Sequence, residues 1–267
     1  LGWLVAAWAL GRVAVFVSGL IGAGLGAVLD SVFLVALTAL TGREVWTGKN
    51  WRNLRVVGLV ALMAIGNVVF HVETIVTGTA AHGTRIGIAT GVVLNSMIVG
   101  RIVPSFTMNW LRPRGPGAMP VPFARFDAVV IGISSAALAL WVVRPQGAIT
   151  GAALVVAGLF QAARLQRWVG WRTAGEKLVL VLHVAYLFVP LGFLLLGAIE
   201  LGVLPLLPTA ALHAWTIGAI GMMTLAVMTR ASLGHTGRPL TATRAIQVIY
   251  DGSFLATLAR IAMGMGK

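Results

Sequence analysis

Long apolar stretches fill nearly the whole chain, and short polar gaps separate them. A stretch of about 20 residues, at a rise of about 1.5 Å per residue, crosses a hydrocarbon core of about 30 Å as an α-helix. Lipid cannot hydrogen-bond an open sheet edge, so helices are expected throughout. The pattern therefore predicts an all-α, polytopic transmembrane helix bundle of about nine spans, at residues 1–20, 22–40, 56–77, 84–107, 126–143, 147–165, 177–199, 207–230 and 244–265.

The composition agrees with this class. Hydrophobic residues make up 58% of the 267 positions and charged residues 10%, and the mean hydropathy is +0.94. Such a chain cannot cover a water-exposed surface with polar groups, so lipid is expected to solvate most of it. There is no cysteine, which excludes disulfides, thiolate zinc sites and cysteine catalysis.

The basic residues indicate an orientation. They gather in every second gap, in four sets: Arg43, Lys49, Arg52 and Arg55; Arg112, Arg114 and Arg125; Arg167, Arg172 and Lys177; Arg230, Arg238 and Arg244. By the positive-inside rule these gaps are cytoplasmic, which places the N-terminal end in the cytoplasm. The net charge of +13 thus indicates topology, and no nucleic-acid partner is expected. Because the sequence starts at Leu1 and stops as a span finishes, we expect residues 1–267 to be a single transmembrane domain from a longer multi-span protein.

Charged residues inside spans need a partner, a cavity or a cofactor, because each costs about 2.5–3.5 kcal/mol on insertion scales. Arg12 and Asp30 lie at matched depths in the first two spans. We predict an ion pair between them, with a structural role or a role in transport.

The histidines are the candidate metal ligands. Asn67 and His71 are one turn apart on one face of the third span, and His71 and His213 are both expected near the outer boundary. Two histidines at one level on different helices suit bis-imidazole ligation of a haem iron, and Ala214 and Gly218 would leave room for a flat macrocycle. The alternative is that each imidazole is hydrogen-bonded within the bundle.

Other residues could contribute to cofactor binding. His183, near the inner face, could ligate a second metal centre or form a hydrogen bond within the bundle. His82, in an outer loop, could bind copper together with His71 or be solvated. Arg101 and Arg230, near inner helix ends, could hold haem propionates or another anion, or extend to lipid headgroups.

Several segments carry a resemblance to a known family. They are Arg101 to Thr107, His213 to Gly218, Met228 to Arg238, Asn50 to Leu54, Asn67 to His71 and Leu10 to Arg12. Across most of its length the chain resembles the NnrS family. Gly234-His235-Thr236-Gly237-Arg238 is a hallmark of that family, with helix termination and headgroup binding as the alternative interpretation for His235.

The resemblance implies a bacterial inner-membrane protein that carries haem and copper and is linked to nitric oxide metabolism and relief of nitrosative stress. Two other hypotheses stay open: a transporter of a small solute that uses Arg12, Asp30 and Asn95, and a structural subunit of a membrane redox complex. Membrane lipid and nitric oxide are the expected partners. The sequence contains no nucleophile triad, phosphate loop or reactive carboxylate pair, so enzyme status is left open.

Overall fold

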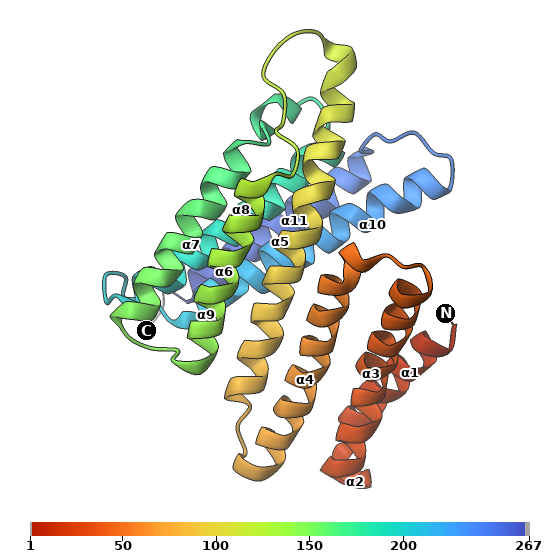
Figure 1. Ribbon diagram of the computed structural model, residues 1–267, viewed down its shortest axis with the longest axis vertical. Coiled ribbons are helices and arrows are strands. Elements are labelled where there is room, and N and C mark those ends of the chain that lie inside the picture. The colour runs from red at the N-terminus through yellow and green to blue at the C-terminus, as the bar shows by residue number, and fades with distance from the viewer. Residues whose placement is uncertain (1, 265–267) are drawn as a thin grey trace. The chain divides into compact units, whose positions relative to one another are not determined.

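The computed structural model describes residues 2–264, and this part of the chain is helical without any strand. The helices are α1 (Gly2–Phe16), α2 (Ser18–Ile21), α3 (Ala23–Thr47), η1 (Trp51–Asn53), α4 (Leu54–Thr77), α5 (Ala81–Leu111), η2 (Arg112–Arg114), α6 (Arg125–Val143), α7 (Ala148–Gln166), η3 (Gly170–Thr173), α8 (Lys177–Glu200), α9 (Pro208–His213), η4 (Ala214–Gly221), α10 (Met222–His235) and α11 (Arg244–Met263). Figure 1 shows them as long rods joined by short turns. The prediction of an all-α protein is confirmed.

Seven segments are long and apolar enough to cross a membrane: Ala23–Thr47, Trp51–Thr77, Ala81–Arg114, Arg125–Val143, Ala148–Gln166, Lys177–Glu200 and Pro208–His235. They correspond to seven of the nine predicted spans. The first predicted span is instead split into α1 and α2 at Val17, and α1 has only 15 residues, or about 22 Å. The last corresponds to α11, which carries Arg244, Asp251 and Arg260. Residues 1 and 265, at the ends of these two predicted spans, lie outside the described residues.

The chain divides into two compact units, residues 1–94 and 95–267. In the first unit α3 packs against both α1 and α4. Gly26 of α3 lies so close to α1 that an added Cβ would be 3.2 Å from the carbonyl oxygen of Ala14. A small residue thus lets the two helix backbones approach closely at this level. Glycine also ends α4, because Gly78 takes the left-handed conformation with φ of 74°.

In the second unit α8 is the central helix, in contact with α7, α9, η4 and α10. The fully buried Trp215 donates its indole N–H to the carbonyl oxygen of Val189, at 3.0 Å. An added Cβ at Gly192 would collide with this indole, so the ring can lie against α8 only because residue 192 is glycine. Trp215 also packs edge-on against Phe193 and Trp141, at centroid distances of 4.9 and 5.8 Å. The aromatic cluster therefore joins α6, α8 and η4.

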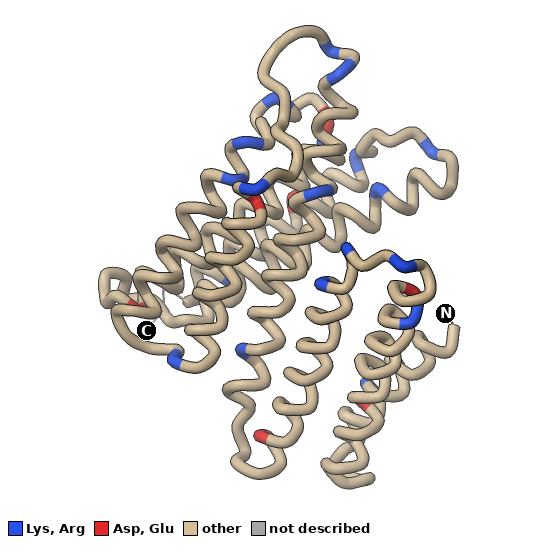
Figure 2. The backbone as a smooth tube through the Cα atoms, viewed as in Figure 1, with Lys and Arg blue, Asp and Glu red and all other residues tan. Residues whose placement is uncertain are grey.

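The loop between α5 and α6 is held against the rest of the second unit. The Pro- and Gly-rich stretch 113–122 is typical of an extended loop, and no α-helix forms between Leu111 and Arg125. Val121 donates its backbone N–H to the carbonyl oxygen of Arg167, and Arg172 donates to that of Ala118, at 3.0 and 2.6 Å. Figure 2 shows that most Lys and Arg positions of this unit lie towards the end of the helices that carries the loop.

Candidate functional site

The most polar site of the first unit surrounds a buried carboxylate. Asp30 on α3 forms an ion pair with Arg12 on α1, as predicted from their matched depths. Its Oδ2 accepts a hydrogen bond from the side-chain amide of Asn67, at 2.9 Å, and lies 3.0 Å from Nε2 of His71. We call Arg12, Asp30, Ser31, Asn67 and His71 the Asp30 cluster. The carboxylate thus has three partners on two neighbouring helices, which offsets the cost of its burial.

Local sequence explains how the helices bring these groups together. An added Cβ at Gly11 would lie 2.9 Å from the Cα of Asp30, so glycine allows α1 to approach α3 at this level. Asn67 and His71 are four residues apart on α4 and therefore face α3 together. The Ser31 hydroxyl lies 2.9 Å from the side-chain oxygen of Asn67, to which it donates. The amide orientation of Asn67 is therefore held from α3.

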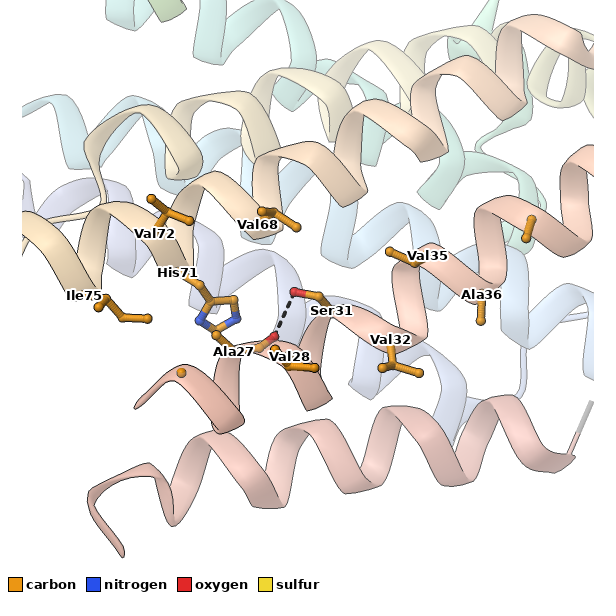
Figure 3. Close-up of a pocket in the computed structure, with 12 residues that line it drawn as sticks. Ala27, Val28, Ser31, Val32, Val35, Ala36, Val68, His71, Val72 and Ile75 are labelled. Carbon is orange, nitrogen blue, oxygen red and sulfur yellow. Dashed lines mark hydrogen bonds between the residues drawn. The ribbon is translucent and has the colours of Figure 1, made fainter. Parts of the chain in front are cut away.

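His71 also faces an apolar pocket. In Figure 3 its imidazole projects from α4 towards α3, among Ala27, Val28 and Val68. The pocket has a volume of about 550 Å³, and its other lining residues are almost all small or aliphatic. Nε2 is occupied by Asp30, whereas no hydrogen bond within residues 2–264 reaches Nδ1. An imidazole whose second nitrogen is held by a carboxylate is the usual arrangement of a metal-ligating histidine.

A second pocket, of about 460 Å³, borders the Asp30 cluster and is lined by Arg12, Asp30, Asn67 and His71 together with residues of α5. The imidazole thus lines two pockets, and the second contains the ion pair of Arg12 and Asp30 among mostly apolar residues.

The other predicted histidines have different surroundings. His82 is exposed at the start of α5, where its Nδ1 lies 2.7 Å from the carboxylate of Glu73. His183 is buried in α8, with Nε2 2.8 Å from the hydroxyl of Thr107. An added Cβ at Gly170 would lie 2.6 Å from Nδ1 of His183, so backbone closes that side of the ring. Because Nδ1 of His183 is buried without a hydrogen-bond partner in the described chain, the choice between a hydrogen-bonded role and an inner metal centre stays a prediction.

His213 belongs to the second unit, so the predicted pairing of His213 with His71 stays a prediction. It is half-buried at the end of α9, directly before the π-helix η4. Single-turn π-helices are rare and often occur at functional sites. Gly218 was expected to leave room for a flat macrocycle. An added Cβ at Gly218 would collide with the Phe188 ring, so a side chain of α8 already fills this space.

Three further candidates lie elsewhere in the second unit. Arg101 on α5 has its guanidinium 5.3 Å from the ring centroid of Phe123. Arg230 on α10 lies 4.2 Å from the ring centroid of Phe106, a cation–π contact. His235 is exposed at the last position of α10, where the helix ends as the alternative interpretation expected. Among the described residues of the second unit, no hydrogen bond or ion pair joins His235 to Arg101, Arg230 or His183.

Sequence reasoning missed the most buried charge of the described chain. Arg164 on α7 is fully buried and donates from Nε to the carboxylate of Asp127 on α6, at 2.8 Å. Its Nη1 donates to the carbonyl and hydroxyl oxygens of Ser96, at 3.0 and 2.8 Å, and to the hydroxyl of Tyr186, at 2.9 Å. Gln161 bonds to both Tyr186 and Ser96, at 2.6 and 3.0 Å. The Arg164 cluster is defined as Ser96, Asp127, Gln161, Arg164 and Tyr186. The matched-depth argument used for Arg12 and Asp30 would have predicted the ion pair of Arg164 and Asp127.

The predicted copper site at His71 and His82 stays a prediction. Within residues 2–264 no three His, Asp or Glu side chains are grouped so that they could hold a metal ion. The predicted copper ligand His82 is instead held by Glu73. The donor set at His71 offers one imidazole from this unit, which is a ligand that a haem iron accepts.

Comparison with known proteins gives one result. The profile of a protein family described as NnrS protein matches residues 1–267, the whole chain. No curated protein and no solved structure matches.

Proposed function

Because the chain belongs to the NnrS family, we propose that it is a multi-pass protein of the bacterial inner membrane that binds haem through His71 and takes part in nitric oxide metabolism or the relief of nitrosative stress. The observation that carries the haem proposal is the His71 imidazole, held at Nε2 by Asp30 and facing an apolar pocket. A haem iron with an exchangeable ligand binds nitric oxide. The N-terminal end is proposed to lie in the cytoplasm, on the distribution of basic residues.

Each residue of the Asp30 cluster has a distinct role in this proposal. His71 would ligate the iron through Nδ1, and Asp30, held at Nε2, would fix the ring orientation and increase the basicity of the imidazole. Arg12 and Asn67 hold the Asp30 carboxylate in place. The aliphatic lining of the pocket would exclude water from a bound macrocycle. His213 is the second ligand that the sequence predicts, and His183, Arg101, Arg230 and His235 stay candidates without a derived role.

An optical spectrum of the purified protein tests the proposal. We expect a Soret band in the wild-type protein, a shift of that band when nitric oxide is added, and loss of the band in His71→Ala. Ile65→Ala, on the exposed side of the same helix, is the matched control and should keep the band. Added imidazole should restore the band to His71→Gly, because the free ligand can occupy the vacated volume. A colourless wild-type protein, or a band that His71→Ala leaves unaltered, contradicts the proposal.

Transport is the second candidate function, favoured by the pocket that Arg12 and Asp30 line. Asn95, the third residue assigned to a transport route, donates its amide to the carbonyl oxygen of Ala219, at 3.3 Å. This hydrogen bond gives Asn95 a packing role within its unit. A metal-free, colourless protein that moves a solute into liposomes would support transport over haem binding.

A further inference from the structure

A third pocket, in the second unit, is distinct from the Asp30 cluster. It has a volume of about 280 Å³ and lies between α5 and the loop that precedes α6. Its polar lining consists of Arg101, Ser105, Asn109 and Arg112, and Phe123 contributes an aromatic wall. Pockets for drug-sized ligands usually have volumes of roughly 300–1,000 Å³, so this one suits a compact group.

The helix periodicity explains why these polar side chains share a pocket. Residues 101, 105 and 109 are separated by four positions each, which places them on one face of α5, and Arg112 follows directly as the first residue of η2. Every one of them can donate hydrogen bonds: arginine offers five N–H groups and no acceptor, serine one O–H and asparagine two N–H groups. The side chains that line this pocket include no Asp or Glu among the described residues. A donor-rich, positively charged pocket selects an anion.

The two arginines have no competing carboxylate. Neither Arg101 nor Arg112 forms an ion pair within the described part of the chain, whereas Arg164 and Arg167 both lie within 4.0 Å of Asp127, at 2.8 and 3.4 Å. The charges of Arg101 and Arg112 are therefore free for a ligand. Arginine is the preferred residue for phosphate because its planar guanidinium can form two parallel hydrogen bonds to phosphate oxygens.

The loop wall of the pocket is held in place by the protein itself. Arg172 donates to the carbonyl oxygen of Ala118, and the backbone N–H of Val121 donates to that of Arg167. Phe123, two residues further on, lies within cation–π distance of Arg101, at 5.3 Å from its guanidinium carbon to the ring centroid. The ring thus restricts Arg101 before any ligand arrives, which lowers the entropy lost on binding.

From these observations we propose that the pocket formed by Arg101, Ser105, Asn109, Arg112 and Phe123 binds a phosphate group. Two sources offer this chemistry, namely the headgroup of an anionic phospholipid and a soluble phosphate compound. This assigns Arg101 to a phosphate and not to a haem propionate.

The test compares three probes on the purified full chain, exchanged into phosphate-free detergent. Inorganic phosphate represents the soluble source, phosphatidylglycerol the lipid source, and diacylglycerol is the lipid without phosphate. Retained ligand is counted by native mass spectrometry, and the midpoint of thermal unfolding is measured with each probe. We expect phosphate or phosphatidylglycerol to bind to the wild type, with at least tenfold weaker binding to the double variant Arg101→Gln/Arg112→Gln.

Arg125→Gln is the matched control, because Arg125 is exposed at the end of the same loop but does not line the pocket. It should bind both phosphate probes as the wild type does. Binding of inorganic phosphate alone identifies a soluble source, and binding of phosphatidylglycerol alone identifies a headgroup. If the double variant fails to fold, Ser105→Ala and Asn109→Leu are tested in its place. Each should bind the phosphate probe at least threefold more weakly than the wild type.

Three results would overturn the proposal: no binding of either phosphate probe to the wild type, equal binding to the double variant, or diacylglycerol bound as tightly as phosphatidylglycerol. The Soret band is recorded on the same samples. Failure of haem binding at His71 and failure of phosphate binding on α5 are therefore seen separately.

Discussion

Replacing Arg164 by methionine is expected to destabilise the second unit by about 3–5 kcal/mol, the cost of removing one partner of a buried ion pair. Four hydrogen bonds leave the guanidinium, to Asp127, to the carbonyl and hydroxyl oxygens of Ser96 and to Tyr186. In Arg164→Met the buried Asp127 carboxylate keeps only the backbone N–H of Ala124, at 2.9 Å, and Arg167, at 3.4 Å. The cost therefore arises chiefly from a carboxylate left without its main counter-charge.

Arg167 provides the matched control, because it lies on the next turn and also contacts Asp127. Its side chain is 26% exposed, compared with 0% for Arg164. A partly exposed ion pair contributes about 0–1 kcal/mol, and the contact of Arg167 with Phe126 adds about 0.5–1 kcal/mol. Arg167→Met should therefore cost less than about 2 kcal/mol.

Reversible unfolding in mixed detergent micelles, followed by tryptophan fluorescence and circular dichroism, measures both variants. The double variant Asp127→Asn/Arg164→Met should recover at least half of the loss, because the introduced asparagine is neutral but keeps an oxygen for the N–H of Ala124. The reasoning is refuted if Arg164→Met costs no more than Arg167→Met, or if the double variant is as unstable as Arg164→Met.

Two other substitutions test close contacts of the helices. Gly11→Ala should destabilise the first unit by about 1–3 kcal/mol, because the new Cβ would lie 2.9 Å from the Cα of Asp30. The control Gly58→Ala should be neutral or stabilising, because no atom lies within 4 Å of its new Cβ. Equal thermal midpoints for the two variants would contradict this reasoning. Asn95→Leu should cost about 1 kcal/mol in the same unfolding assay through loss of the bond to Ala219 in the π-helix, and an unchanged stability would show that the bond contributes nothing.

Hydropathy predicted the apolar, central parts of most helices but not the residues at which they end. The predicted span 126–143 differs from α6 by one residue, whereas α3 continues seven residues beyond the predicted end at residue 40. Arg43 and Glu44 lie within that extension. Hydropathy reports which residues can lie in lipid, and a helix can continue into the headgroup region without apolar side chains. The same limit applies to α11, which is helical over 20 residues despite its charges.

The candidate site was predicted in part. Matched depth predicted the pair of Arg12 and Asp30, because two opposite charges at one level of adjacent antiparallel helices have few other partners. The bond from His71 to Asp30 was missed, since the imidazole was assigned to a cofactor without asking which group would hold its second nitrogen. The π-helix η4, which contacts α8, was not predicted, because hydropathy does not distinguish π-helical from α-helical hydrogen bonding.

Two of the buried carboxylates, Asp30 and Asp127, suggest different roles for the two units. Asp30 and Asp127 each pair with an arginine, but the side chain of Arg12 is 53% exposed and that of Arg164 is 0% exposed. The Asp30 cluster borders two pockets, so a ligand can change its hydrogen bonds without unfolding the helices. The Arg164 cluster is enclosed, and any change there costs stability first. Substitution of Asp30 should therefore alter the spectrum of a bound cofactor more than the unfolding midpoint. Substitution of Asp127 should lower the unfolding midpoint more than it alters the spectrum. An Asp127→Asn protein that loses its colour at unchanged stability would contradict this division.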